Sequence, residues 1–310
     1  MRIVSLISSG TEILFALGLG DRVVAVSHEC DYPADALTLP RVTRSWIDSS
    51  KPSGEIDQQV KHCLAAGQPL YAIDTEILCR LAPDLIVTQA QCDVCAVRLA
   101  DVADLVRSRA ELQSAQVLAL NPQSLAEVLA DIRRVGKAAG AADEATRLCA
   151  LLNERIKRVA ATTAHLPAAE RPRVVCLEWI SPLMAAGNWT PELIELAGGC
   201  SGLATSGRHT DYVGWNDIRA FDPEVLLVSP CGFDLARSRR EAELLRGLLG
   251  FAELSAVRAG RAFVIDGNAY LNRSGPRLVE SLELLAALIQ PELFPAPVGE
   301  LAEGRAWSRL

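Results

Sequence analysis

A single long segment, residues 143–165, carries the most regular hydrophobic pattern in the chain. Its apolar positions recur in steps of three and four, at Ala145, Leu148, Leu152, Ile156 and Val159. That spacing lines one face of a helix. Acidic residues open the segment and basic residues follow toward its end, an order that opposes the helix dipole. At about 1.5 Å per residue, the helix would be roughly 33 Å long, the width of a small domain.

Short apolar runs alternate with helical patterns on both sides of this segment. We predict strands at residues 2–7, 22–27, 70–73, 85–89 and 116–120 before it, and at 173–177, 225–229 and 262–266 after it. Alternation of this kind is typical of a parallel sheet covered by helices. The sequence therefore predicts an α/β fold in which two Rossmann-like α/β lobes are joined by a long spine helix.

The same pattern gives the expected domain limits. We expect an N-terminal α/β lobe at residues 1–121, connecting helices at 122–170 that include the spine helix 143–165, and a C-terminal α/β lobe at 171–290. The last segment, 291–310, holds three prolines and few apolar residues, so we expect a surface tail. A short echo supports related lobes, because residues 81–87 (LAPDLIV) resemble residues 221–227 (FDPEVLL).

Composition limits the classes of function. Half of the 310 residues are hydrophobic and 22% are charged, as in a globular protein. The net charge of −7 and the absence of a basic run argue against a nucleic-acid partner. No apolar run approaches the roughly 20 residues of a membrane span. The first residues pass directly into a strand without an export signal, so we expect a cytoplasmic location, or a periplasmic one if the sequence is trimmed.

Ligands of open parallel sheets bind at the carboxyl ends of the strands. In the first half these positions hold Ser8, Ser9, Thr11, His28, Glu29, Cys30, Asp31, Tyr32, Gln89, Gln91, Cys92 and Cys95. In the second half they hold Glu178, Trp179, Cys231, Phe233, Tyr270, Asn272 and Arg273, with Asn188, Trp189 and Trp215 in loops that could join them. Tryptophans at such loops favour a cleft that stacks a flat, largely apolar ligand. The alternative is that they only cover the edges of the lobes.

Several stretches of the sequence resemble a known family. They are the opening IVSLISSGTEILFALGLGDRVVAVS, the DYP at 31–33, the LAPDLIV strand and the RSGPRLVESL segment at 273–282. Together they resemble the helical-backbone substrate-binding proteins that feed vitamin B12, haem and ferric siderophores to ABC importers. Over residues 3–289 the chain is most similar to the cobalamin-binding branch of that class.

The resemblance implies that the chain binds a cobalamin-type corrinoid, or a related metal chelate, in the cleft between two lobes. It implies no catalysis, and an ABC importer as partner if the protein is exported. It places five residues against the ligand: Tyr32, Trp46, Trp215, Tyr270 and Arg273. The strand ends add Trp179, Trp189 and Asn272 to this set. The motifs GxSxG, HExxH and GxxxxGK do not occur in the sequence, so we expect no enzyme.

Nine cysteines make an odd and high count. Four of them have apolar neighbours and are expected to be buried: Cys63, Cys79, Cys149 and Cys176. Cys92 and Cys95 form a CxxC that we expect at a helix start, and Cys30 follows a strand of the same sheet with His28 close by. Three thiols and an imidazole suit zinc or an iron–sulfur cluster.

This group of residues supports a second hypothesis. In it the chain is a cytosolic metalloprotein or enzyme with a zinc or iron–sulfur site at Cys30, Cys92 and Cys95, assisted by His28. Other interpretations stay open from the sequence. The CxxC could be a redox pair or ordinary packing, and His28 or a cysteine could coordinate the metal of a bound corrinoid.

Overall fold

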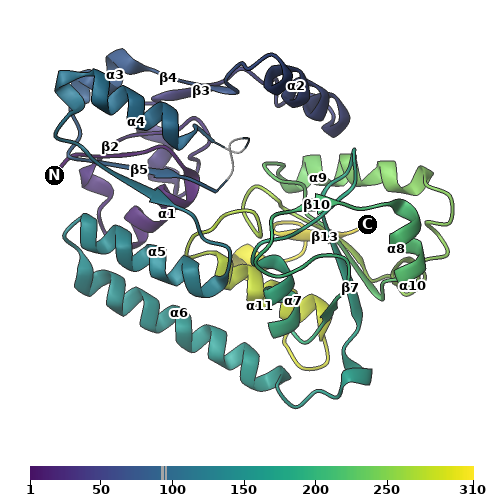
Figure 1. Ribbon diagram of the computed structural model, residues 1–310. Helices are drawn as coiled ribbons and strands as arrows, with labels where there is room; N and C mark the ends of the chain where they lie inside the picture. The colour runs from purple at the N-terminus through teal and green to yellow at the C-terminus, as the bar shows by residue number, and fades with distance from the viewer. Residues whose placement is uncertain (92–93, 95) are drawn as a thin grey trace. The chain divides into compact units, whose positions relative to one another are not determined.

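The computed structural model describes residues 1–91, 94 and 96–310 (Figure 1). The chain divides into two compact units. The N-terminal unit comprises Met1–Lys51, Glu55–Pro122 and Ala126–Leu151, and the C-terminal unit comprises Pro52–Gly54, Gln123–Leu125 and Leu152–Leu310. Each unit has its own main sheet, so the predicted fold class, α/β with two lobes, is confirmed.

The N-terminal unit is built on a parallel sheet in the order β2-β1-β5-β6. Its strands are β1 (Ile3–Ser5), β2 (Val23–Val26), β5 (Leu85–Gln89) and β6 (Gln116–Leu120), and β3 (Thr43–Ser45) pairs with β4 (Tyr71–Ile73) in a separate antiparallel ribbon. Its helices are α1 (Ser8–Ala16), α2 (Ser53–Ala65), α3 (Thr75–Leu81), α4 (Leu99–Ser108) and α5 (Leu125–Ala138). Every residue of β5 is buried, as expected for a central strand of a parallel sheet covered by helices.

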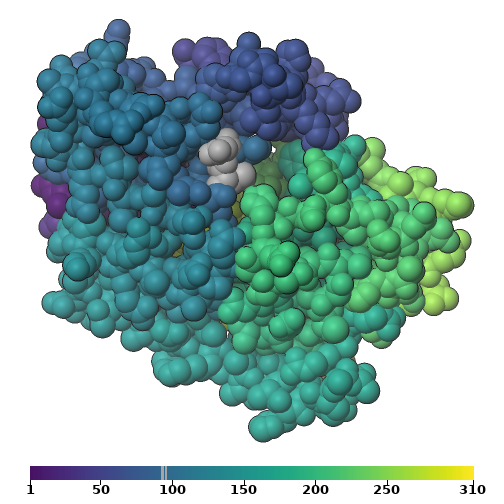
Figure 2. All heavy atoms as spheres, viewed as in Figure 1, coloured from purple at the N-terminus to yellow at the C-terminus, as the bar shows by residue number. Residues whose placement is uncertain are grey.

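Most residues of helix α2 are not buried. Its apolar face contains Ile56 and Val60, which are only partly buried, and Leu64, which is half exposed. Figure 2 shows the atoms of this segment on the outer surface. Cys63, on the same helix, and Cys79, on α3, are partly exposed, whereas the sequence predicted buried thiols at both positions.

The C-terminal unit is built on a larger mixed sheet in the order β10-β8-β7-β11-β12-β13, with β9 beside β7. Its strands are β7 (Arg173–Trp179), β8 (Met184–Ala185), β9 (Cys200–Ser201), β10 (Asp211–Tyr212), β11 (Val225–Val228), β12 (Ala262–Ile265) and β13 (Trp307–Arg309). Its helices are α7 (Thr190–Leu196), α8 (Trp215–Phe221), α9 (Leu235–Ala242), α10 (Ser255–Arg258) and α11 (Leu278–Ile289). Strands β7, β11 and β12 are parallel, which gives this unit a Rossmann-like centre.

The last residues add a strand to that sheet. The sequence predicted a surface tail at 291–310, but β13 pairs antiparallel with β12. Trp307 is buried and meets the ring of Phe263 edge-on at 5.5 Å. Strand β13 has only three residues after a proline-rich stretch, too few to show strand periodicity, which is why the pattern alone did not reveal this edge strand.

The sequence similarity between residues 81–87 and 221–227 is accompanied by a similar backbone conformation and similar hydrogen bonds. Ala82 and Asp222 both adopt left-handed backbone, with φ of 38° and 46°, just before the proline. The N–H of Arg2 donates to Asp84 at 2.6 Å, and the N–H of Arg173 donates to Glu224 at 2.9 Å. The same junction therefore anchors the first strand to the central strand in each unit.

Helix α6 (Ala142–Thr163) is the predicted spine, and it starts one residue earlier and ends two earlier than expected. The limit between the units falls within it, after Leu151. In its first half, Ala145 packs closely against Gly136 of α5. In its second half, Arg155 makes a two-pronged ion pair with Glu283 of α11, with N–O distances of 2.9 and 2.7 Å.

Candidate functional site

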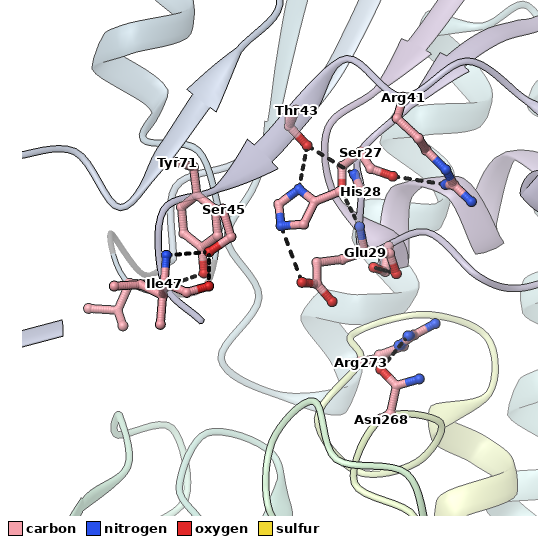
Figure 3. A network of polar contacts seen from close by, with 12 residues as sticks. Ser27, His28, Glu29, Arg41, Thr43, Ser45, Ile47, Tyr71, Asn268 and Arg273 are labelled. Atoms are coloured by element: carbon pink, nitrogen blue, oxygen red, sulfur yellow. Dashed lines mark hydrogen bonds and ion pairs between the residues drawn. The ribbon is translucent and has the colours of Figure 1, made fainter. Parts of the chain in front are cut away.

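The loop after β2 is held in place by its neighbours. Arg41 donates to the carbonyl oxygens of Ser27 at 2.9 Å and Cys30 at 2.5 Å. The hydroxyl of Ser8, at the start of α1, donates to the carbonyl oxygen of Glu29 at 2.9 Å. These bonds fix the backbone of the loop at the carboxyl edge of the N-terminal sheet (Figure 3).

His28 is the centre of a polar group in this loop. Its backbone N–H donates to Thr43 Oγ1 at 3.0 Å, and its Nδ1 lies 2.7 Å from the same oxygen. Because that oxygen accepts the backbone N–H, its own proton can be donated to Nδ1, which favours the Nε2–H tautomer. Nε2 lies 3.2 Å from a carboxylate oxygen of Glu29, and the ring of Tyr71 lies 5.5 Å away (Figure 3).

A small cavity of about 40 Å³ lies beside this group, lined by Ser8, Ser27, His28 and Thr43 among others. A water molecule needs roughly 10–15 Å³ of such space. The cavity is therefore large enough for a few waters and far too small for a flat macrocycle. A large ligand would contact the carboxyl edge of the sheet rather than enter this cavity.

Cys30 was predicted as a metal ligand, and its thiol is buried beside α1. The residue is 1% exposed, and Thr11 Oγ1 donates to its sulfur at 3.0 Å. Cys92 and Cys95 lie outside the described residues, and α4 begins at Leu99, after the CxxC. Among the described residues no group of three or more His, Cys, Asp or Glu side chains could hold a metal ion. The metal-binding prediction therefore has no support.

Two predicted ligand residues of the N-terminal unit are well exposed. Tyr32 is 45% exposed in the loop after β2, and Trp46 is 55% exposed just after β3. The guanidinium carbon of Arg44 lies 4.5 Å from the centre of the Trp46 ring. A large aromatic side chain with this exposure offers its face to a ligand.

In the C-terminal unit, three side chains cluster at the ends of β7 and β11. The ring of Trp179 lies 5.1 Å from that of Phe233, and the guanidinium carbon of Arg237 lies 3.5 Å from the centre of the Phe233 ring. Phe233 is buried, while Trp179 and Arg237 are partly exposed. The sequence pointed to Trp179 and Phe233 but missed Arg237, because α9, which carries it, was not predicted.

The loop after β12 holds three of the predicted residues. The Asn272 side chain donates to the carbonyl oxygens of Ser229 and Gly267, at 3.0 and 2.9 Å. Arg273 donates to Asn268 Oδ1 at 2.7 Å (Figure 3). Tyr270 is 6% exposed, and burial raises its pKa to about 12. Asn272 thus serves the loop itself, and Arg273, which is buried, is held by Asn268.

The remaining two predicted residues pack within the C-terminal unit. Trp189 is 5% exposed, and its indole N–H donates to the carbonyl oxygen of Leu271 at 2.6 Å. Trp215 stacks on Phe251, with ring centres 6.3 Å apart, and donates to the carbonyl oxygen of Leu249. These contacts stabilise the unit. A role for either side chain at a ligand stays a prediction.

Two α/β units joined by one continuous helix, with aromatic and charged side chains at the carboxyl ends of the strands, define the helical-backbone class of binding proteins. Residues 3–269 match the family model described as periplasmic binding protein, and the chain belongs to that family. Among the described residues, no helix is long and apolar enough to cross a membrane.

Two relatives match almost the whole chain. A vitamin B12-binding protein of Vibrio cholerae is 26% identical over 93% of this chain and 89% of its own length. An uncharacterized ABC transporter substrate-binding lipoprotein of Bacillus subtilis, YvrC, is 25% identical over 94% of this chain and 81% of its own length. The predicted resemblance to substrate-binding proteins of ABC transporters is confirmed.

Solved structures share the fold. The periplasmic vitamin B12 binding protein BtuF of Vibrio cholerae is 22% identical, with a TM-score of 0.67 over 94% of this chain and 96% of its own. A periplasmic heme binding protein from Pseudomonas aeruginosa is 21% identical, with a TM-score of 0.71 over 96% of this chain and 95% of its own. At this identity the similarity shows the fold alone. It is about as high for the vitamin B12-binding structure as for the heme-binding structure.

The expectation of a cytoplasmic location is wrong. The family is that of periplasmic binding proteins, one relative is a lipoprotein, and the solved structures above are periplasmic proteins. These findings point outside the cytoplasm. The expectation rested on the first residues of the sequence alone, and the relatives correct it.

Proposed function

We propose that the chain is an extracytoplasmic substrate-binding protein of an ABC importer, and that its ligand is a corrinoid or related tetrapyrrole. The observation that carries the proposal is the similarity, over 93% of the chain, to a protein named for vitamin B12 binding. Within this class of ligands we propose cobalamin. A position of the ligand between the two lobes stays a prediction from the sequence.

The chemistry of the strand ends supports a flat ligand with polar substituents. Aromatic side chains lie at strand ends in each unit: Tyr32 and Trp46, both exposed, in one, and Trp179, partly exposed, in the other. Their faces suit a macrocycle, since stacking adds roughly 0.5–1.5 kcal/mol beyond area burial. Arg237 and Arg273 supply cationic donors at the edge of the C-terminal unit.

A visible-absorbance titration of ligand-free protein with hydroxocobalamin tests the proposal. We expect a saturable spectral change, and we expect Trp46→Ala and Trp179→Ala each to weaken binding several-fold because a stacking face is lost. Leu151→Ala is the control, because Leu151 is an exposed apolar residue of α6, away from the strand ends. A wild-type protein that gives no saturable change with hydroxocobalamin or haemin would remove the proposal.

A further inference from the structure

A cavity of about 470 Å³ lies at the amino-terminal edge of the C-terminal sheet. It is lined by Glu224, directly before β11, by Arg261, directly before β12, and by Ser255, Arg258 and Ala259 from the connection between these two strands. Its volume is within the roughly 300–1,000 Å³ of sites for small molecules. Because ligands of parallel sheets bind at the carboxyl edge, this cavity lies away from the residues described above.

Two guanidinium groups of this cavity can donate further hydrogen bonds. The Arg258 side chain is exposed and makes no hydrogen bond or ion pair with any residue that the structure describes. Arg261 is partly buried, and its Nη2 donates to the carbonyl oxygens of Leu288 and Ile289, at 3.4 and 2.7 Å. A guanidinium has five N–H donors, so Nε and Nη1 of Arg261 remain for another acceptor. Burial lowers the pKa of Arg261 more than the Glu224 carboxylate raises it, and an anion beside Arg261 would stabilise its charged form.

The two carboxylates at this edge have other partners. Glu224 accepts from the backbone N–H of Arg173 at 2.9 Å and pairs with the guanidinium of the same residue at 3.5 Å. Asp222 accepts from the backbone N–H and the hydroxyl of Ser255, at 2.8 and 2.7 Å, and these bonds lower the pKa of Asp222. Within the described part of the chain, neither carboxylate forms an ion pair with the two guanidiniums of the cavity. The attraction between them acts only over a longer range.

The matching place in the N-terminal unit shows that the shared construction does not require this charge. The similarity of residues 81–87 to 221–227 places Glu224 at the position of Asp84. The pairing of β11 with β12 and of β5 with β6 then places Arg261 at the position of Gln116. Gln116 is exposed and uncharged. The positive charge of Arg261 therefore belongs to the cavity of the C-terminal unit, and not to the junction that both units share.

We propose that this cavity is a second ligand site, in which Arg258 and Arg261 bind a small soluble oxyanion. A guanidinium matches the oxygens of carboxylate and phosphate alike. Glu224 lines the same cavity and would repel the anion, so neutralising this residue should strengthen binding. The inference goes beyond the proposed function and does not depend on it, because the cavity lies at the opposite edge of the sheet from the predicted tetrapyrrole contacts.

Calorimetric titration with inorganic phosphate and with citrate, each at constant ionic strength, tests the site. The variants are Arg258→Gln, Arg261→Gln and Glu224→Gln, the last of which retains an acceptor for the backbone N–H of Arg173. Arg240→Gln is the matched control. Arg240 is an exposed arginine of α9, which follows β11 at the other edge of the sheet.

We expect saturable binding of at least one of the two anions by the wild-type protein. Arg258→Gln should weaken binding about threefold to fivefold, because water screens an exposed charge. Arg261→Gln should weaken it by about tenfold, the effect of a lost charge-assisted hydrogen bond. Glu224→Gln should strengthen binding, and Arg240→Gln should leave the affinity unchanged.

Saturation by phosphate alone assigns a tetrahedral anion, and saturation by citrate alone assigns a carboxylate. Wild-type protein that binds neither anion, unchanged affinity in Arg258→Gln, or equal weakening in Arg240→Gln would overturn the proposal. Arg258→Gln removes no hydrogen bond within the described structure, so it gives a result even if loss of the Ile289 contact unfolds Arg261→Gln. Failure to bind a tetrapyrrole would remove the proposed function and leave this site standing.

Discussion

Tyr270 shows how burial decides the chemistry of a side chain at the edge of the sheet. It follows β12, where exposure to a ligand was expected, yet it is 6% exposed and its hydroxyl reaches the carbonyl oxygen of Glu300 at 3.5 Å. Burial is the main cause that raises the phenol pKa from 10.0 to about 12, and the carboxylate of Glu280 adds to it. The phenol therefore stays a neutral hydrogen-bond donor over the working range of pH.

This pKa makes a prediction for stability at alkaline pH. Because the phenol of the unfolded chain ionises near 10.0 and that of the folded chain near 12, its contribution to stability is complete below pH 10 and is lost as pH rises toward 12. We expect Tyr270→Phe to lose less stability than wild type across this interval, measured by urea unfolding at stepped pH. An identical pH dependence in the two proteins would contradict the assignment.

At the scale of residues, the sequence placed the loops at the strand ends better than it oriented their side chains. Trp179, Trp189, Trp215 and Tyr270 were all singled out by their place after a strand or in a neighbouring loop. Trp179 and Trp215 remain partly exposed, each with an aromatic partner, whereas Trp189 is buried and donates to the Leu271 carbonyl oxygen. Position along the chain fixes where a loop begins, but the rotamer depends on packing partners distant in sequence.

At the scale of elements, helix α6 is attached to the C-terminal unit by the ion pair of Arg155 with Glu283. Both side chains are 31% exposed, and the contact is two-pronged. We expect Arg155→Ala to lower the free energy of unfolding by about 1 kcal/mol, since half-exposed bidentate pairs exceed ordinary surface pairs only modestly. A double-mutant cycle with Glu283→Ala, followed by urea unfolding, isolates the coupling.

Arg147 provides the matched control on the same helix. Its partner Glu144 is three residues earlier, and both are far more exposed, so Arg147→Ala should change stability by a few tenths of a kcal/mol at most. A coupling energy for Arg155 and Glu283 no larger than that of Arg147 and Glu144 would show that the link to α11 does not stabilise the unit.

The close contact of α5 with α6 depends on a glycine, Gly136. A Cβ on Gly136 would lie 2.5 Å from the Ala145 Cβ and 2.8 Å from the carbonyl oxygen of Ala141. We expect Gly136→Ala to destabilise the protein by about 1–3 kcal/mol through overpacking, against a gain in helix propensity of roughly 1 kcal/mol. In thermal unfolding, Gly136→Ala combined with Ala145→Gly should recover part of the loss, because the contact with the Ala145 Cβ is relieved and that with the Ala141 carbonyl oxygen remains. A single variant as stable as wild type would contradict the close packing.

The elements themselves were predictable to the extent that they follow a simple period. Strands β5 and β6 were predicted with their exact limits, and the long helix was predicted within two residues. Strands β8, β9 and β10 have only two residues each, too few to show alternation. Helices α8, α9 and α10 were missed because they are too short to show a clear helical period. Strand β13 exists because β12 offers an open edge, which is a property of the tertiary structure.

At the scale of the whole molecule, the chain repeats one construction. The αL–proline–acid junction before β5 recurs before β11, and each anchors the first strand of its unit through a backbone N–H to carboxylate bond. This repetition, together with the sequence stretches that resemble substrate-binding proteins, made the fold class predictable. The location was not predictable, because the same fold can serve in any compartment. The relatives, rather than the residues, correct that expectation.

Calorimetric titration of one ligand-free preparation with cyanocobalamin and, in parallel, with haemin tests the central claim most directly. The account predicts saturable binding of cyanocobalamin at one equivalent, with a negative heat-capacity change from burial of the macrocycle against aromatic side chains. Tighter binding of haemin than of cyanocobalamin would contradict the choice of cobalamin and leave a tetrapyrrole-binding protein. Absence of saturable heat with both ligands, in protein shown to be folded, would contradict the claim that this chain binds a tetrapyrrole.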